Sequence, residues 1–92
     1  MGTALIKIKL MPESPDLDLE EIKEIAQELV ESNKGSKVNF EIQPIAFGLK
    51  ALIVGFAIDE ADELEPIENA LREIEEVASV EVVDMRRAFG WV

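Results

Sequence analysis

Apolar and polar residues alternate along several short segments of the chain. In residues 3–11, TALIKIKLM, every second position is apolar: Ala4, Ile6, Ile8 and Leu10. A period of two predicts a β-strand with one buried side. Residues 37–43 alternate in the same way, and residues 77–85 place Val80 and Val82 inward as a last strand. These three segments are therefore expected to form strands.

Residues 49–58 are apolar at nearly every position, which favours a central strand covered on both faces. Gly55 lies within this segment. A glycine inside a strand predicts either a bulge or a close approach of another group to the backbone.

Two further segments have apolar residues three or four positions apart, the spacing of an amphipathic helix. The stripes are Leu19, Ile22, Ala26, Leu29 and Val30 in the first segment, and Leu64, Ile67, Leu71 and Ile74 in the second. Asp16 or Asp18 suits the N-cap of the first helix, and Gly35 suits a left-handed residue at its end. Pro66 is tolerated only in a first turn, so the second helix should start close to residue 65.

The predicted order of elements is β-α-β-β-α-β in a single domain spanning residues 1–92. With right-handed crossovers, two such units pack as a four-stranded antiparallel sheet with both helices on one face. The expected fold is therefore an α+β, ferredoxin-like sandwich. A chain of this size buries roughly 60–65% of its unfolded surface, enough for one core but not for a deep cleft. This favours a binding module.

The acidic residues are concentrated in two places, although the net charge of the whole chain is −11. Residues 16–31 contain seven acidic residues and one base, residues 59–76 contain nine and one, and the remainder is mildly basic. Both acidic segments are predicted helices, so solvated helix faces can account for the acid. The cations expected on the opposite sheet face and the strand ends are Lys7, Lys9, Lys50, Arg86 and Arg87. An acidic partner should therefore meet the sheet side, whereas nucleic acid is disfavoured.

Several kinds of chemistry are excluded by composition. The chain has neither cysteine nor histidine, which removes thiolate metal sites, disulfides and the usual general base. Its glycines form no phosphate-binding loop, and there is no tyrosine to stack on RNA bases. A metal site built from carboxylates alone is left open by these absences. Nearly all of the carboxylates, however, fall on helix positions that face water, so we expect no metal site, no cofactor and no paired-carboxylate catalysis.

No membrane partner is expected either. The longest apolar run, residues 51–58, is far shorter than the about 20 residues that a membrane-spanning helix needs. No cationic stretch followed by an apolar segment marks a signal peptide at the start. These features predict a cytoplasmic protein.

Two segments carry candidate contacts. The connection QPIAFGLK, residues 43–50, is longer and more apolar than a hairpin requires. Either Ile45 and Phe47 cap the core, or Phe47 projects as an aromatic anchor for a partner. Adjacent Arg86 and Arg87 end the last strand and should point to opposite faces. They are either a solubilising end or a source of one cation for a partner's phosphate or metal site.

The strings PIAFGLKAL, KIKLMPESPD and VASVEVVDMRR resemble the translation elongation factor 1-beta family, most closely its short archaeal members, across essentially the whole chain. The resemblance implies a guanine-nucleotide-exchange factor that promotes GDP release from elongation factor 1-alpha, the GTPase that delivers aminoacyl-tRNA, and its reloading with GTP. Such a factor acts on its partner without covalent chemistry.

The resemblance also implies residue roles. Aligning the endings places the family's basic residue, which reaches the magnesium and phosphate region of the GTPase, at Arg87. Phe47 of the PIxFG motif belongs to a second contact, near the place where the GTPase holds the tRNA end. Eukaryotic members have lysine and nearly end there, whereas this chain has arginine and continues to Val92, so Arg86 also stays a candidate and Trp91 has no assigned role. The expected partner-binding residues are Pro44, Ile45, Phe47, Gly48, Lys50, Arg86 and Arg87.

Two other functions are compatible with the same fold. A small regulatory domain that binds an amino acid or other metabolite between subunits would need a polar notch at a sheet edge and homodimerisation. An enzyme of the acylphosphatase type would need an anion-binding loop with Arg and Asn after the first strand. Residues 11–14 of this chain read MPES, so a phosphate would meet a carboxylate there.

Overall fold

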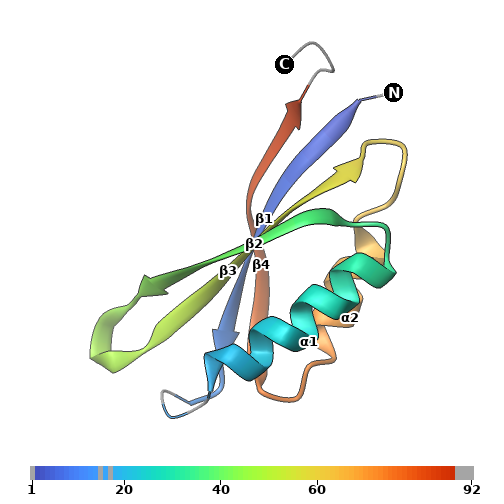
Figure 1. Ribbon diagram of the computed structural model, residues 1–92. Coiled ribbons are helices and arrows are strands. Elements are labelled where there is room, and N and C mark those ends of the chain that lie inside the picture. The colour runs from blue at the N-terminus through green and yellow to red at the C-terminus, as the bar shows by residue number, and fades with distance from the viewer. Residues whose placement is uncertain (1, 15, 17, 89–92) are drawn as a thin grey trace.

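The computed structural model describes residues 2–14, 16 and 18–88. Its elements are β1 (Thr3–Pro12), α1 (Leu19–Ser32), β2 (Ser36–Pro44), the 3-10 turn η1 (Ala46–Gly48), β3 (Lys50–Asp59), α2 (Glu65–Arg72) and β4 (Val77–Ala88). All strand pairs are antiparallel, in the order β2-β3-β1-β4 (Figure 1). The predicted α+β, ferredoxin-like fold is confirmed. Trp91 lies outside the described residues.

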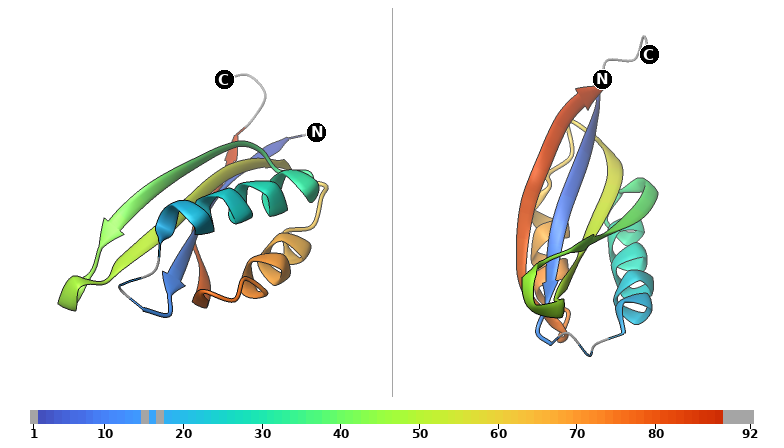
Figure 2. Two further views of the ribbon diagram at one scale, coloured as in Figure 1. Left: turned by 60° about the horizontal axis from the view of Figure 1, so that its bottom comes forward. Right: turned by 90° about the vertical axis from the view of Figure 1, so that its left-hand side faces the viewer.

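Both helices pack on one face of the sheet, and the core lies between these two layers (Figure 2). Its fully buried large side chains come from β1, β3 and both helices: Ile8, Leu10, Ile22, Val30, Leu52, Val54, Ile67 and Leu71. Burying an aliphatic side chain of this size stabilises the fold by about 1.5–3 kcal/mol. The other face of the sheet carries no helix and is called the open face below.

The ends of α1 follow the predicted chemistry with one exception. Asp18 is the N-cap, and its Oδ1 accepts a hydrogen bond of 2.9 Å from the N–H of Glu20. The left-handed residue after the helix is Lys34, with φ 75°, so the assignment to Gly35 was wrong. Gly35 is needed for space instead, because a Cβ there would overlap the side chain of Val30.

The second helix starts at Glu65 with Pro66 in its first turn, as predicted. It ends at Arg72, so Ile74 lies in the following turn, where it is nevertheless buried. None of the helices in the described part of the chain is long and apolar enough to cross a bilayer.

The strand β3 is central, since β1 and β2 pair with its two edges and every residue from Ala51 to Ile58 is buried. The sheet is longer than the helix layer. The β2–β3 hairpin extends past the helices at one end, and the end of β4 extends past them at the other (Figure 1). The described domain measures 42 × 22 × 17 Å along its principal axes. This elongation sets the two candidate contacts apart.

Candidate partner-binding site

The β2–β3 hairpin ends in a tip of three residues, Ala46–Gly48. The N–H of Ile45 donates a hydrogen bond of 2.7 Å to the carbonyl oxygen of Leu49, which closes the loop. Phe47 (φ 64°) and Gly48 (φ 78°) both have left-handed backbone conformations. Glycine adopts this conformation freely, but a residue with a Cβ does so at a cost of about 1–2 kcal/mol.

The tip directs the ring of Phe47 into solvent, where the residue is 97% exposed. Of the two alternatives for Phe47, the capping of the core is therefore wrong, and the projecting ring is the one that the structure has. Ile45 and Leu49 are half-buried at the base of the loop, whereas Pro44 and Lys50 are exposed and face each other across the hairpin. An exposed aromatic ring on a strained backbone is typical of a binding contact.

The two arginines lie at the opposite end of the sheet and on opposite faces. Arg86 faces Leu5 of β1 across the strand pair, and Arg87 faces Ala4. Because residues opposite each other share a face, Arg86 belongs to the open face and Arg87 to the side that carries the helices. The predicted divergence of the two cations is confirmed.

Each arginine makes one ion pair with the protein's own carboxylates. Arg86 Nε lies 3.1 Å from Asp84 Oδ2, and Arg87 Nε lies 3.5 Å from Glu60 Oε2. The arginine side chains remain 75% and 71% exposed. Surface pairs of this kind contribute about 0–1 kcal/mol, so neither guanidinium group is held strongly.

The structure does not bring the two groups of candidate residues together. On β1, Leu10 faces Leu52 of β3, and Ala4 faces Arg87 of β4. The six residue-to-residue steps from Ala4 to Leu10 span roughly 20 Å. The hairpin continues beyond Leu52 to Phe47. A single partner that contacts both groups must extend along most of the sheet.

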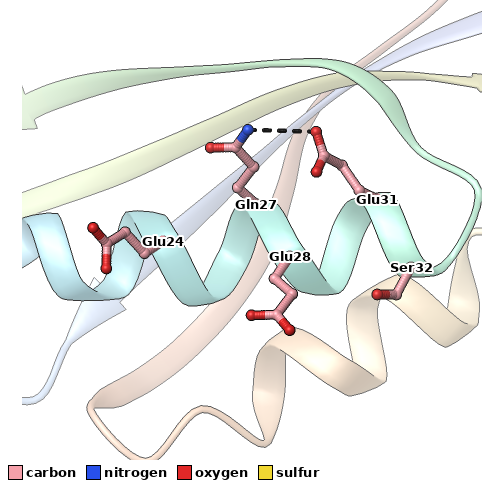
Figure 3. Close-up of a pocket in the computed structure, with 5 residues that line it drawn as sticks. All are labelled: Glu24, Gln27, Glu28, Glu31 and Ser32. Carbon is pink, nitrogen blue, oxygen red and sulfur yellow. Dashed lines mark hydrogen bonds between the residues drawn. The ribbon is translucent and has the colours of Figure 1, made fainter.

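The helix side is strongly acidic. Along α1, Glu24, Glu28 and Glu31 line a shallow hollow of about 390 Å³ together with Gln27 and Ser32 (Figure 3). Gln27 Nε2 donates a hydrogen bond of 3.4 Å to Glu31 Oε2. No group of three or more acidic side chains within the described residues is arranged to hold a metal ion. This surface is best described as a solvated acidic face.

The open face is mixed in charge rather than uniformly basic. Lys7 faces Asp84, and Lys9 faces Glu81, across the β1–β4 pair. The predicted difference in charge between the two sides of the domain is therefore present in a weaker form. An acidic partner is repelled by the helix side but not by the open face.

Sequence reasoning missed Glu60 and Asp84, the partners of the two arginines. Asp84 stands two positions before Arg86 on one strand, so alternation alone could have paired them. Glu60 lies in the turn after β3, and only the tertiary fold brings it to Arg87.

An exposed aromatic hairpin and exposed cations on a ferredoxin-like sheet are the features of a protein-binding module. Residues 5–88 match the family model described as the EF-1 guanine nucleotide exchange domain. The chain therefore belongs to this family, which confirms the resemblance predicted from its sequence.

Curated relatives named "Elongation factor 1-beta" match almost the whole chain. The relative from Methanocaldococcus jannaschii is 43% identical over 89 residues, which cover 96% of this chain and 100% of the relative. The relative from Methanothermobacter thermautotrophicus is 45% identical over 89 residues, which cover 95% and 98%. The relative from Methanosarcina barkeri is 43% identical over 88 residues, which cover 95% and 99%. These relatives do not favour the alternative of a metabolite-binding regulatory domain.

Proposed function

We propose that the protein is a guanine-nucleotide-exchange factor for translation elongation, which promotes release of GDP from elongation factor 1-alpha and thereby its reloading with GTP. The observation that carries this proposal is the match of residues 5–88 to the EF-1 guanine nucleotide exchange domain. The chain needs no cofactor of its own for this activity, because exchange breaks no covalent bond. It acts in the cytoplasm, where translation elongation takes place, and neither nucleic acid nor a membrane is a direct partner.

The proposed contacts lie at the two ends of the sheet. The hairpin residues Pro44, Ile45, Phe47, Gly48 and Lys50 bind one part of the GTPase. Arg86 and Arg87 approach the nucleotide site in another part. Binding at the first contact raises the effective concentration of the second, because the rigid sheet joins them.

The chemistry of release is electrostatic. Bound GDP is held by Mg²⁺ and by backbone groups that contact its phosphates. A guanidinium group inserted there disfavours the neighbouring Mg²⁺ through like-charge repulsion and so weakens the hold on the nucleotide. Arg87 is the first candidate, because the family resemblance places the basic residue there when the endings are aligned without gaps; Arg86 is the second.

The magnitudes are compatible with this mechanism. A thousandfold acceleration of release requires about 4 kcal/mol of barrier lowering. One desolvated charge contact is worth about 2–5 kcal/mol. Thermodynamic linkage makes this effect reciprocal: the exchange protein weakens nucleotide binding to the GTPase, and bound nucleotide weakens binding of the exchange protein by the same ratio. The complex therefore dissociates after new nucleotide has bound.

A stopped-flow experiment tests the function. Elongation factor 1-alpha from the organism that makes this protein is loaded with fluorescent GDP. It is then mixed with excess unlabelled GDP and increasing amounts of this protein. We expect the release rate to rise with concentration to a plateau, whereas an unrelated acidic protein of similar size has no effect. An unchanged rate at concentrations that form the complex would overturn the proposal.

A further inference from the structure

The open face contains a groove of about 340 Å³. Of the proposed contact residues, Arg86 alone is among the residues that line it. Its floor is the stretch of β3 around Gly55 and Ala57. The surrounding side chains come from all the other strands: Leu5 and Lys7 of β1, Lys37 and Asn39 of β2, and Asp84 and Arg86 of β4.

The groove exists because β3 has small residues on this face between strands with longer side chains. Gly55 lies in register between Lys7 of β1 and Asn39 of β2. A Cβ at position 55 would come within 2.6 Å of Asn39 Oδ1, so the Asn39 side chain lies across the glycine. Of the two alternatives predicted for Gly55, the close approach of another group is therefore confirmed. The register shift in the neighbouring strand β2 lies between Ser36 and Asn39.

The rim of the groove is cationic. The bulge in β2 lies between Ser36 and Asn39 and contains Lys37, whose φ of 52° is left-handed. A bulge changes the direction of the side chains around it, and here Lys37 borders the groove. Lys7 and Arg86 add two further cations, against one acid, Asp84. An apolar floor with a cationic rim suits an apolar side chain next to a carboxylate.

We propose that this groove receives a segment of the GTPase that presents an acidic side chain beside an apolar one. This inference rests on the proposed function and extends its interface from the ends of the sheet onto the open face. Arg86 borders the groove and is also a proposed contact, so a partner that approaches Arg86 from the open face covers the groove as well. The net charge of −11 opposes nucleic acid as the occupant.

The substitution Lys37→Glu tests the rim charge, and Lys34→Glu is its matched control. Both lysines are exposed and have left-handed φ angles, so the two variants have the same net charge and similar backbone demands. Lys34 Nζ lies 3.5 Å from Asp62 Oδ1, and Lys34 is not among the residues that line the groove. We expect Lys37→Glu to raise the Kd for nucleotide-free elongation factor 1-alpha at least tenfold, and Lys34→Glu to change it less than threefold. Equal effects of the two variants would overturn the groove as a contact.

Cross-linking gives a second measurement that does not depend on affinity. The chain has no cysteine, so Lys37→Cys and Lys34→Cys each allow attachment of a photo-cross-linker at one position. We expect the label at position 37 to capture the GTPase in the complex, and the label at position 34 to capture little. Capture of a second copy of the chain, or of added RNA in place of the GTPase, would overturn the proposal. If the unmodified protein accelerates GDP release, but Lys37→Glu leaves the Kd unchanged and the label at position 37 does not capture the GTPase, the groove is not a contact. The proposed exchange function would be unaffected by that result.

Discussion

The two ends of the sheet present different chemistry by different means. At the hairpin end, a left-handed backbone turn holds an uncharged ring that is 97% exposed. At the other end, strand register places two cations on opposite faces, and each makes an ion pair with a carboxylate of the same chain. The hairpin contact is therefore set by local backbone conformation, whereas the arginine contact is set by pairing between strands.

This difference indicates a division of roles. Burial of an apolar ring acts only at contact and depends little on salt. A cation acts over roughly 8 Å at physiological ionic strength and acts most strongly where water is excluded. We therefore expect the hairpin to govern how tightly the partner is held and an arginine to govern how fast its nucleotide leaves.

The largest expected effect is that of Arg87→Ala on the plateau rate of GDP release. We expect a fall on the order of 100-fold, because one desolvated charge contact is worth about 2–5 kcal/mol. The melting temperature should hardly change, since the side chain is 71% exposed. Stopped-flow kinetics and a thermal melt measure the two quantities.

Arg86→Ala is the matched control for this variant. It removes the same charge from the open face and should change the plateau rate by less than about tenfold. A larger loss in Arg86→Ala than in Arg87→Ala would assign the inserted cation to Arg86, and unchanged rates in both variants would remove this end from the mechanism.

The second effect is on affinity. Phe47→Ala should raise the Kd for elongation factor 1-alpha by roughly 30-fold, because truncating an aromatic anchor at an interface costs about 2 kcal/mol or more. The plateau rate at saturating factor should stay the same, because the nucleotide site is contacted from the other end. Titration calorimetry and the concentration dependence of release measure this, with Phe47→Leu as a control that keeps an apolar side chain. A fall in melting temperature without a change in Kd would instead make the hairpin tip a structural element.

The smallest effect concerns the ion pair at the arginine end. Glu60→Gln removes the carboxylate 3.5 Å from Arg87 Nε while keeping its shape. We expect less than about 1 kcal/mol of lost stability, since the pair is exposed, and less than a threefold change in release rate. Chemical denaturation and stopped-flow kinetics test this. A tenfold slower release with unchanged stability would show that Glu60 positions Arg87. The arginine end of the sheet would then need a fixed side-chain position, as the hairpin end needs a fixed backbone conformation.

Local patterns in the sequence predicted much of the architecture. The period-two and helical spacings located the strands and helices, and the apolar run in residues 51–58 identified the central strand. The same patterns could not decide whether Phe47 faces inward or outward. That choice depends on the left-handed backbone at Phe47, and phenylalanine has no preference for such a conformation.

The faces of the two arginines show the limit most clearly. Alternation counted onward from the inward residue Val82 would turn Arg86 inward as well. In the structure, Lys7 pairs with Asp84 and Ile8 with Val82, so Val83 is an extra residue in a bulge. A shift of one residue moves every later side chain to the other face. Arg86 therefore lies on the open face, and Arg87 on the helix side.

The sequence alone determined the order of elements, the position of the core and the acidic character of the helices, because these depend on the spacing of residues along one segment. The tertiary structure alone decided the separation of the two contacts, the faces of the arginines and the groove above Gly55. These depend on register and bulges, which arise only when one strand pairs with another.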